Sequence, residues 1–457
     1  MTALELTASA HDAIDRYADV LIAFGDDVLK HPEIGFREHR TSTKICEELR
    51  KLGFTVEEGL AVTGARARLK CAKPGPTICI MAELDGLPVP GHPLADPSNA
   101  VAHACGHNAQ LAHLLGAARA LVETEAAGKL AGEIVFLIVP AEEYVDLEFR
   151  AGLARHGKIE FYGGKPEMIR LGLFDDVDMA MMIHASGTPG AKPFSMCWHY
   201  NGFIAKQVNF IGRAAHAGAA PFRGVNALNA ASVALHAMHV QRETFRDEDQ
   251  IRVHPIITHG GNAINVVPSD VRLETFVRGA TMEAIADAAG KVDRAMIAGA
   301  LAVGASVEIQ TLPGYLPLFN DRNFGSIFKD AASSVSGPGG WSEMSSIAAC
   351  TDVGDLSHIM PVAHPSHGGC SGANHTVDWT IADPHAAYVA PAKALAATVI
   401  ELLSDGAVKA KSTVAQFTPK LTRDQYLTTI RSFMSSDTFA YSAESGSIAK
   451  LPHADHH

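Results

Sequence analysis

The chain has 457 residues, more than one hydrophobic core usually serves, so two domains are expected. Hydrophobic residues make up 47% and charged residues 19%, as in an ordinary globular protein. A net charge of −12 without a lysine- and arginine-rich cluster argues against nucleic acid as the main partner. The N-terminus lacks the pattern of a signal peptide, and no run of about 18 apolar residues is present to span a membrane.

The first part of the chain alternates helical and strand-like patterns. Helical periodicity over residues 9–53 ends at Gly53, a typical helix stop. Three apolar runs of strand length follow, at residues 77–82, 132–140 and 179–183. A helix is predicted between the first two of them, at residues 109–128. This alternation predicts an α/β fold with a mixed sheet covered by helices on both faces.

The pattern changes near residue 195. Residues 197–313 predict the order β-α-β-β-α-β, which is that of a ferredoxin-like α+β sandwich. An α/β pattern then returns through residue 404, and one further helix is expected at 422–434. We therefore expect a larger domain of residues 1–196 and 314–457 with a smaller domain, 197–313, inserted into it.

Polar residues follow the predicted strands of the larger domain. Asp85, Glu142, Glu143 and His184 each come directly after an apolar run. In sheets of this kind, functional groups gather at the carboxyl ends of the strands. Two adjacent carboxylates at such an edge can have different functions, because one can bind a metal ion while the other transfers a proton. The simpler explanation of a Glu pair is a solvent-exposed turn.

Cys105 and His107 form a Cys-x-His pair just before a predicted helix. A thiolate and a neutral imidazole one residue apart suit a borderline-soft divalent ion such as zinc. A buried cysteine beside a surface histidine explains the pair equally simply. His375, in a Gly-Ala-Asn-His-Thr segment, is a further candidate ligand. The seven cysteines are an odd number, which favours reduced thiols and a cytoplasmic location over a disulfide framework.

Taken together, these residues resemble a family of co-catalytic metallopeptidases and amidohydrolases. The family includes carboxypeptidase G, aminoacylase, aminobenzoyl-glutamate hydrolase and the plant auxin-conjugate amidohydrolases, and the resemblance is to its branch with a cysteine in the metal site. The motifs that carry it, in chain order, are HPEIGF, AELDGLP, HACGHN, PAEE, MIHAS, GRAAHAGAAP, NVVPSD, TDVGDLSH and GANHT.

The resemblance implies one or two divalent ions, manganese or zinc. The metal ligands that it implies are Cys105, His107, Glu143, His184 and His375. It also implies that Glu142 is the general base and acid, and that Asp85 supports the ligands. An ion of this kind lowers the pKa of a bound water to roughly 7, which lets a neighbouring carboxylate take its proton near neutral pH.

The inserted domain resembles the lid and dimerisation domain of that family. His216 matches the lid histidine, which in the family reaches the partner subunit's site and stabilises a developing oxyanion. Asn265 and Arg278 match lid positions that hold a substrate carboxylate, and the planar arginine fork suits that ligand. A homodimer and a small-molecule substrate bearing a carboxylate are therefore expected.

The chain departs from the family beside the expected ligands. Tyr144 replaces the usual glycine after the Glu pair, residues 152–167 form a longer segment, and Asn108 replaces a common acidic residue. The leading hypothesis is hydrolysis of a C–N bond, most simply the amide of an N-acyl amino acid or an aromatic acid conjugate. One alternative is hydrolytic deamination of an aromatic amine, such as a nitroanthranilate, with release of ammonia. Another is a non-catalytic binding protein on the same scaffold.

Overall fold

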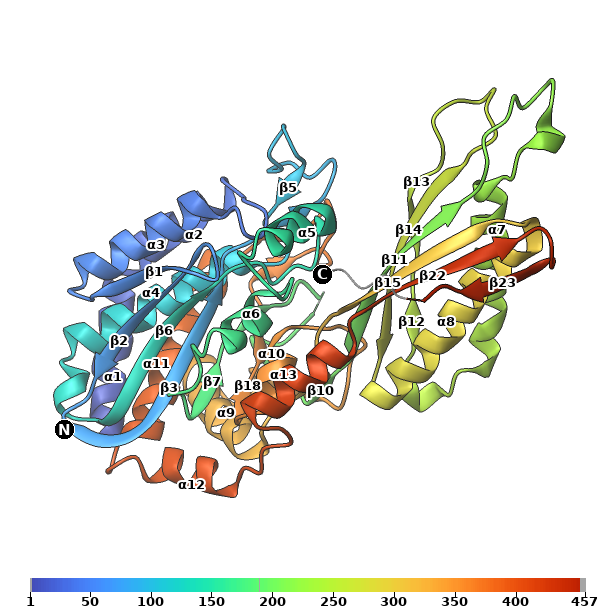
Figure 1. Cartoon of the computed structure of the whole chain (residues 1–457). Helices are drawn as coiled ribbons and strands as arrows, with labels where there is room; N and C mark the ends of the chain where they lie inside the picture. Colours follow the sequence, from blue (N-terminus) through green and yellow to red (C-terminus); the bar gives the residue numbers. More distant parts are fainter. Residues whose placement is uncertain (1, 189, 453–457) are drawn as a thin grey trace. The chain divides into compact units, whose positions relative to one another are not determined.

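The structure, a computed structural model, describes residues 2–188 and 190–452 and divides into two units (Figure 1). Unit 1 consists of Met1–His199, Leu318–Ile347 and Thr351–Arg423. Unit 2 consists of Tyr200–Pro317, Ala348–Cys350 and Asp424–His457. In the sequence, most of unit 2 is thus a single segment, Tyr200–Pro317, inserted between the first and second segments of unit 1.

Unit 1 is built on a six-stranded sheet with the strand order β1-β2-β6-β3-β7-β18. The strands are Val56–Leu60, Gly64–Lys70, Ala131–Val139, Lys73–Glu83, Met179–Met181 and Val362–Ala363 in that order. Strand β2 pairs antiparallel with both β1 and β6, whereas β6, β3, β7 and β18 are parallel to one another. The sheet is therefore mixed, as predicted. Consecutive residues of β6 from Ile134 to Val139 are buried, which confirms that both faces of the sheet are covered.

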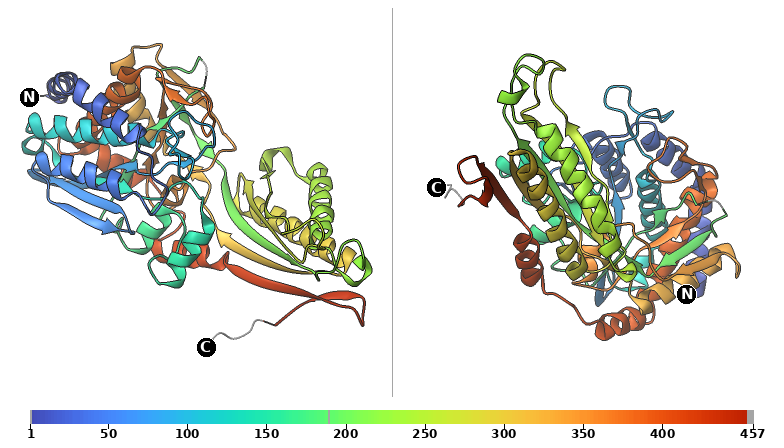
Figure 2. Two further views of the ribbon diagram at one scale, coloured as in Figure 1. Left: turned by 90° about the horizontal axis from the view of Figure 1, so that it is seen from above. Right: turned by 90° about the vertical axis from the view of Figure 1, so that its right-hand side faces the viewer.

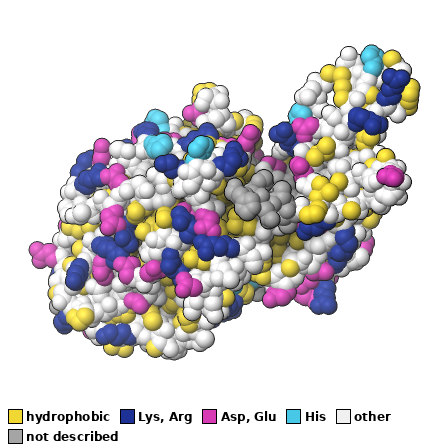
Figure 3. Space-filling model, in the orientation of Figure 1, with side chains coloured by type: hydrophobic (Ala, Val, Ile, Leu, Met, Phe, Trp, Pro, Cys, Tyr) yellow, Lys and Arg dark blue, Asp and Glu magenta, His cyan; other side chains and the backbone are white. Residues whose placement is uncertain are grey.

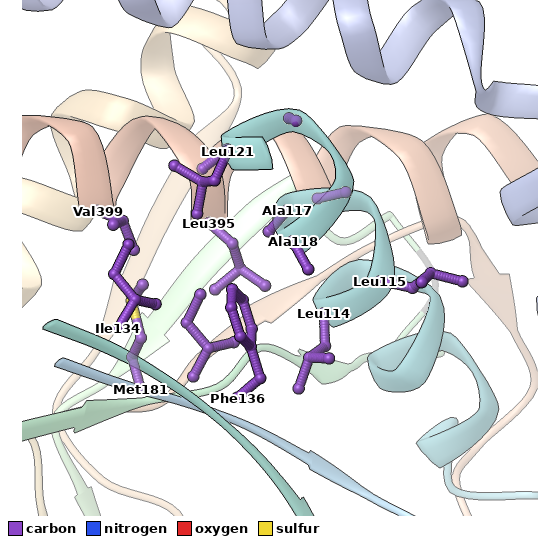
Figure 4. Close-up of a cluster of buried hydrophobic side chains, with 14 of the residues drawn as sticks. Leu114, Leu115, Ala117, Ala118, Leu121, Ile134, Phe136, Met181, Leu395 and Val399 are labelled. Carbon is purple, nitrogen blue, oxygen red and sulfur yellow. The ribbon is translucent and has the colours of Figure 1, made fainter. Parts of the chain in front are cut away.

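Helices pack on this sheet through one large apolar core. The N-terminal helices are α1 (Ala3–Arg16), α2 (Ala18–Leu29) and α3 (His39–Lys51), and α4 (His107–Glu123) and α11 (Ala390–Leu403) complete the layer. Figure 4 shows Leu114 and Leu121 of α4 meeting Phe136 of β6 and Leu395 of α11. This packing fixes the start of α4 against the ends of the central strands.

The prediction of one helical stretch from residue 9 to residue 53 is wrong, because three separate helices occupy this region. The longest break lies between α2 and α3 and contains Pro32 and Phe36. A proline disfavours helical backbone in the residue before it, and Phe36 has a φ of 63°, in the left-handed region that no α-helix contains. The periodicity of the apolar residues was real, but it did not reveal the break.

The segment His385–Leu403 is apolar and long enough to cross a membrane by composition alone, although the sequence analysis found no such run. It consists of one π-helical turn, η5 (His385–Val389), followed by α11. Its most apolar window has a mean hydropathy of 1.4, and 78% of that window is buried inside the protein. Core helices meet the same criteria, so the support for a membrane span is weak.

Unit 2 contains an antiparallel sheet and two long helices in the predicted order β-α-β-β-α-β, except that two short strands stand where the prediction has one. The elements are β11 (Gly202–Ile211), α7 (Ala227–Val240), the short strands β12 (Arg252–Val253) and β13 (Ile256–His259), β14 (Asp270–Gly279), α8 (Met282–Val303) and β15 (Ser306–Pro313). In the sheet, β11 lies between β14 and β15, and both β12 and β13 pair with β14. The two helices and the sheet share a separate apolar core.

The C-terminal part of the chain differs from the prediction, which placed it in the larger domain. Strand β22 (Ser435–Ser442) pairs with β15, and β23 (Ser447–Lys450) pairs with β22, so both extend the sheet of unit 2 (Figure 2). Phe439 and Ile448 pack against the core of unit 2, which explains why the hairpin joins this unit. The predicted helix near 422–434 is present as α13 (Arg423–Ser432).

The remaining helices and short strands connect these layers. They are β4 (Leu87–Pro88), β5 (Val101–Ala102), α5 (Leu147–Arg155), α6 (Gly164–Arg170), β8 (His184–Ala185), β9 (Phe194–Cys197), β10 (His199–Tyr200), β16 (Leu318–Phe319), α9 (Arg322–Ser336), β17 (Trp341–Met344), α10 (Val353–Ser357), β19 (Pro365–His367), β20 (Cys370–Ser371), β21 (Thr380–Ile381) and α12 (Val408–Gln416). Short 3-10 turns occupy Ala126–Gly128, Pro221–Arg223, Gln241–Thr244 and Asp247–Asp249.

Charged side chains of both signs are interspersed over the face shown in Figure 3. Some charged side chains of unit 1 pair across neighbouring strands. Arg68 lies 3.0 Å from Glu133, and Arg66 lies 2.8 Å from Glu57. Pairs this exposed contribute about 0–1 kcal/mol each, so the stability of unit 1 depends on its core rather than on these contacts.

Candidate metal centre and active site

The candidate site lies in unit 1, where the parallel strands end. Glu83 is the last residue of β3, and Asp85 follows it. Glu142 and Glu143 follow the end of β6, and His184 lies just past β7 in the short strand β8. Because β6, β3 and β7 are parallel neighbours, their carboxyl ends meet at one edge of the sheet, which is where functional groups were predicted to gather.

A tight turn before α4 brings Cys105 and His107 to the same edge. Between them, Gly106 has a φ of 88°, and a Cβ there would lie 2.3 Å from the Cβ of Ala185. Only glycine allows this close approach. The turn therefore packs directly against the strand that carries His184, and the backbone N–H of His375 donates to the carbonyl of Ala104 in the same turn at 2.8 Å.

The five predicted metal ligands converge around the thiol of Cys105. Its Sγ lies 3.4 Å from Nε2 of His184 and 3.2 Å from Nε2 of His375. His375 Nε2 also lies 3.1 Å from a carboxylate oxygen of Glu143. Two groups of donor atoms share the thiol: Cys105, His107 and His184 form one, and Cys105, Glu143 and His375 form the other.

These donor atoms fit a divalent cation. Two atoms bound to one ion at about 2.0–2.3 Å each lie roughly 3.0–3.6 Å from one another, which matches the spacings around Cys105. Oε1 of Glu143 and Nε2 of His107 are both buried, and each has another donor atom of the site 3.1 Å away: Nε2 of His375 for the first and Oε2 of Glu83 for the second. Thiolate, imidazole and carboxylate suit zinc, and imidazole and carboxylate also suit other first-row ions.

The charges around Cys105 favour its thiolate form, which is the form that binds metal. Burial and the carboxylate of Glu143 raise the pKa of the thiol, but His184 and His375 outweigh them and bring it to about 5. Burial lowers the pKa of His375, but Glu143 and Cys105 raise it above its usual range. The ligands thus stabilise one another's charged forms.

Asp85 lies beside the predicted ligands and makes hydrogen bonds to their backbone and side chains. Its carboxylate accepts hydrogen bonds from the backbone N–H groups of Glu142, at 3.2 Å, and Glu143, at 2.9 Å. Its backbone carbonyl lies 2.7 Å from Nδ1 of His107 and accepts that proton. The neutral imidazole is thereby fixed with its lone pair on Nε2.

Glu142 is buried beside this cluster, with a carboxylate oxygen 3.9 Å from Nε2 of His107. Burial, together with the charges of Glu83 and Glu143, raises the pKa of Glu142 well above its usual range. A carboxylate with a raised pKa binds a proton more readily than an ordinary glutamate does, which favours the proton-accepting part of general acid–base catalysis.

A buried ion-pair network that the sequence did not reveal lies beside the predicted ligands. Nζ of Lys165 donates to Glu83 at 2.5 Å and also contacts the carboxylate of Asp352, and all three side chains are fully buried. Oε2 of Glu83 accepts from Gln110 at 2.8 Å and lies 3.1 Å from Nε2 of His107. The available signal was a carboxylate at the end of an apolar strand, the same signal that identified Asp85.

The three residues predicted from the lid resemblance all lie in unit 2. Nδ1 of His216 accepts from the N–H groups of Gly218, at 3.2 Å, and Ala219, at 3.0 Å, so the proton of the neutral ring is on the exposed Nε2. The carbonyl of Asn265 accepts from Ala217, which places Asn265 beside His216. In the antiparallel pairing of β11 with β14, Arg278 lies opposite Phe203, at the far end from the turn that carries His216.

The residues that depart from the family pattern are mostly buried packing groups. Asn108 donates to the hydroxyl of Tyr388 at 3.1 Å. Arg150 is fully buried and donates to the carbonyl of Glu143 at 2.5 Å and to that of Tyr162. Tyr144 is also buried and stacks on Tyr162, with 6.0 Å between the ring centres. Arg150 and Tyr144 therefore shape the loop directly behind Glu143, a predicted metal ligand.

With this geometry established, the family follows from sequence comparison. The profile of Peptidase family M20/M25/M40 matches residues 79–401, well over half of the chain. The chain belongs to this family. It is accordingly a metal-dependent hydrolase, as the motifs around Cys105 and Glu142 implied.

Relatives and solved structures agree with this assignment. The Xaa-Arg dipeptidase of Mus musculus is 28% identical over 456 residues, which cover 93% of this chain and 95% of the relative. The N-acyl-L-amino acid amidohydrolase of Geobacillus stearothermophilus is 27% identical over 67% of this chain and 80% of its own length. A dinuclear metal-binding peptidase of the family from Bacillus subtilis shares the fold, with a TM-score of 0.61 at 21% identity over 85% of this chain and 99% of that structure.

We predict that the metal-free protein keeps one thiolate at neutral pH. The pKa of Cys105 is about 5, whereas burial raises the pKa of Cys71 to about 11 and that of Cys370 to about 12. Thiolate absorbance in the ultraviolet, followed during acidification, should therefore show a step near pH 5 that Cys105→Ser lacks. Because the folded pKa lies below the unfolded value of about 8.5, the stability that this thiolate contributes is lost as the pH falls through about 5. A step near pH 8–9 would contradict the prediction.

Proposed function

We propose that the protein hydrolyses a C–N bond in a small carboxylate-bearing molecule, most simply the amide of an N-acyl amino acid or of an aromatic acid conjugate. The observation that carries this proposal is the buried carboxylate of Glu142 beside two donor groups that share Cys105. A relative named as an N-acyl-L-amino acid amidohydrolase and another named as an indole-3-acetyl-aspartic acid hydrolase support the choice of substrate.

Cys105, His107, Glu143, His184 and His375 would hold one or two divalent ions, manganese or zinc. An ion held there lowers the pKa of a coordinated water and polarises the bond under attack. Glu142 takes the proton of the attacking water, whose oxygen forms the new bond to the carbonyl carbon. Glu142 then returns that proton to the leaving nitrogen as the C–N bond breaks, so the products are a carboxylate and an amine.

His216 is proposed to stabilise the negative charge that develops on the carbonyl oxygen. Its Nδ1 accepts two backbone hydrogen bonds, so Nε2–H is the donor that an oxyanion would meet. Asn265 and Arg278 are proposed to bind the substrate carboxylate. His216 and Arg278 lie at opposite ends of the β11–β14 pair, about 25 Å apart at roughly 3.3 Å per strand residue. A small substrate that uses both therefore needs two chains, which supports a homodimer.

A second candidate is deamination of an aromatic amine. It uses the same water and the same base, but the attacked carbon belongs to the ring and ammonia leaves. The observation that favours it is the loop behind Glu143, where the buried stack of Tyr144 on Tyr162 replaces the glycine usual in the family.

Product analysis separates the two candidates. We expect the manganese- or zinc-loaded protein to release an amine and a carboxylate from a panel of N-acyl amino acids and aromatic acid conjugates. Release of ammonia from aminobenzoates, with a phenol as the second product, would favour deamination instead. If neither panel reacts, and Glu142→Gln does not change the affinity for any bound compound, the protein is a binding protein.

Replacement of Glu142 by glutamine and replacement of Glu143 by glutamine should have different effects on metal content. Glu142→Gln should retain metal while kcat falls by roughly 10²–10⁴-fold, the usual contribution of a general base. Glu143→Gln is the matched control and should lose both metal and turnover. Metal analysis by mass spectrometry, paired with steady-state kinetics, measures both effects. Loss of metal from Glu142→Gln would make Glu142 a ligand and contradict its assignment as the base.

The proposed role of His216 across a dimer can be tested by subunit complementation. His216→Ala and Glu142→Gln should each be inactive as homodimers. Mixed dimers made by co-expression with two different tags should regain activity, because one of their two sites then combines an intact Glu142 with an intact His216. Mixed dimers that stay inactive would show that both residues act from the same chain, and a monomeric wild-type protein would contradict the dimer itself.

A further inference from the structure

Glu83 occupies an unusual position for a carboxylate without an assigned role. It lies at the end of β3 and is fully buried, as are its neighbours His107 and Lys165. Each of its oxygens has a distinct contact: Oε1 accepts from Nζ of Lys165 at 2.5 Å, and Oε2 accepts from Gln110 at 2.8 Å. Its backbone N–H also donates to the side-chain oxygen of Gln110 at 2.9 Å. The carboxylate is therefore held rigidly.

The held carboxylate faces an imidazole nitrogen. Oε2 of Glu83 lies 3.1 Å from Nε2 of His107. Nδ1 of His107 donates to the carbonyl of Asp85 at 2.7 Å, so Nε2 is the ring nitrogen directed at Glu83. Two atoms bound to one ion at about 2.0–2.3 Å each lie roughly 3.0–3.6 Å apart, so the spacing of this nitrogen and this oxygen fits a shared metal ion.

Further carboxylates lie close to this pair. Glu83, Glu142 and Asp352 place three carboxylates within one buried network, and Lys165 supplies a single positive charge to it. Oxygen atoms of Glu83 and Glu142 also lie within 4.8 Å of each other and of a ring nitrogen of His107, a span that one ion can bridge.

We propose that Glu83 is a further metal ligand, on the His107 side of the centre, and that Lys165 and Gln110 hold it in position. Lys165 thus acts as a positioning residue: it binds one oxygen of Glu83 and directs the other toward the ion. It comes from the segment 152–167, which is longer here than the family pattern predicts. This inference rests on the proposed function only in that the wild-type protein must bind a divalent ion.

The direct test is a crystal structure of the wild-type protein soaked with manganese or zinc, with the ion located by its anomalous signal. We expect an ion bound to His107 with a Glu83 oxygen at about 2.0–2.2 Å. An ion bound to His107 with both Glu83 oxygens more than about 3 Å away would overturn the proposal. This measurement needs no substitution, so it remains decisive if a variant fails to fold.

Matched variants test the same point in solution by equilibrium dialysis against manganese. Glu83→Gln and Asp352→Asn each remove one of the two carboxylates bound to Lys165, but only Glu83 faces His107. We expect Glu83→Gln to weaken metal binding by at least about tenfold and Asp352→Asn to have a much smaller effect. If Glu83→Gln is unstable, Glu83→Gln combined with Lys165→Met keeps the buried net charge unchanged and should show the same loss.

The outcomes separate this inference from the proposed function. If the wild-type protein binds metal and Glu83→Gln matches Asp352→Asn, Glu83 is not a ligand and only the inference fails. If the wild-type protein binds neither manganese nor zinc, the proposed hydrolytic function fails as well.

Discussion

The candidate site depends on one buried carboxylate, that of Asp85, which is neither a proposed metal ligand nor the proposed base. Asp85 accepts hydrogen bonds from two successive backbone N–H groups, those of Glu142 and Glu143, while its own carbonyl orients His107. Three separate segments, the ends of β3 and β6 and the start of α4, are thus connected through a single residue. Because each contact is buried, its loss would leave polar groups without partners at a cost of about 1–3 kcal/mol each.

A second constraint is the electrostatics of the interior. Carboxylates are rarely buried without compensation, because removing a charge from water is costly. Here several of them lie within a few residues of one sheet edge, and fixed positive charge is scarce beside them. The arrangement is unfavourable for stability alone and therefore indicates a site selected for binding cations. The same excess of buried carboxylates over positive charges raises the pKa of Glu142, because burial and the charges of Glu83 and Glu143 favour its protonated form.

Much of this site was predictable from the sequence, because short apolar runs place the residues that follow them at a known edge of a sheet. Asp85, Glu142 and His184 became candidates in this way, Cys105 became one through its spacing to His107, and the motif resemblance then implied a role for each. Lys165 could not be found by the same reasoning, since its contact with Glu83 joins residues far apart in sequence, and a lysine side chain is usually exposed. The break between α2 and α3 was missed because periodicity reports which face of a helix is apolar, not where the backbone turns.

The pairing of β15 with β22 also constrains how the chain matures. β15 ends at Pro313 and its partner begins at Ser435, so one edge of the unit 2 sheet stays unpaired on the ribosome until almost the whole chain has been made. The folding of unit 1 also cannot finish early, because β18 and α11 belong to the second half of the chain and are synthesised late. Neither unit can be completed during early synthesis, and an exposed strand edge invites pairing with other chains. Premature termination near residue 430 would therefore yield an aggregation-prone product even though every proposed metal ligand had already been synthesised.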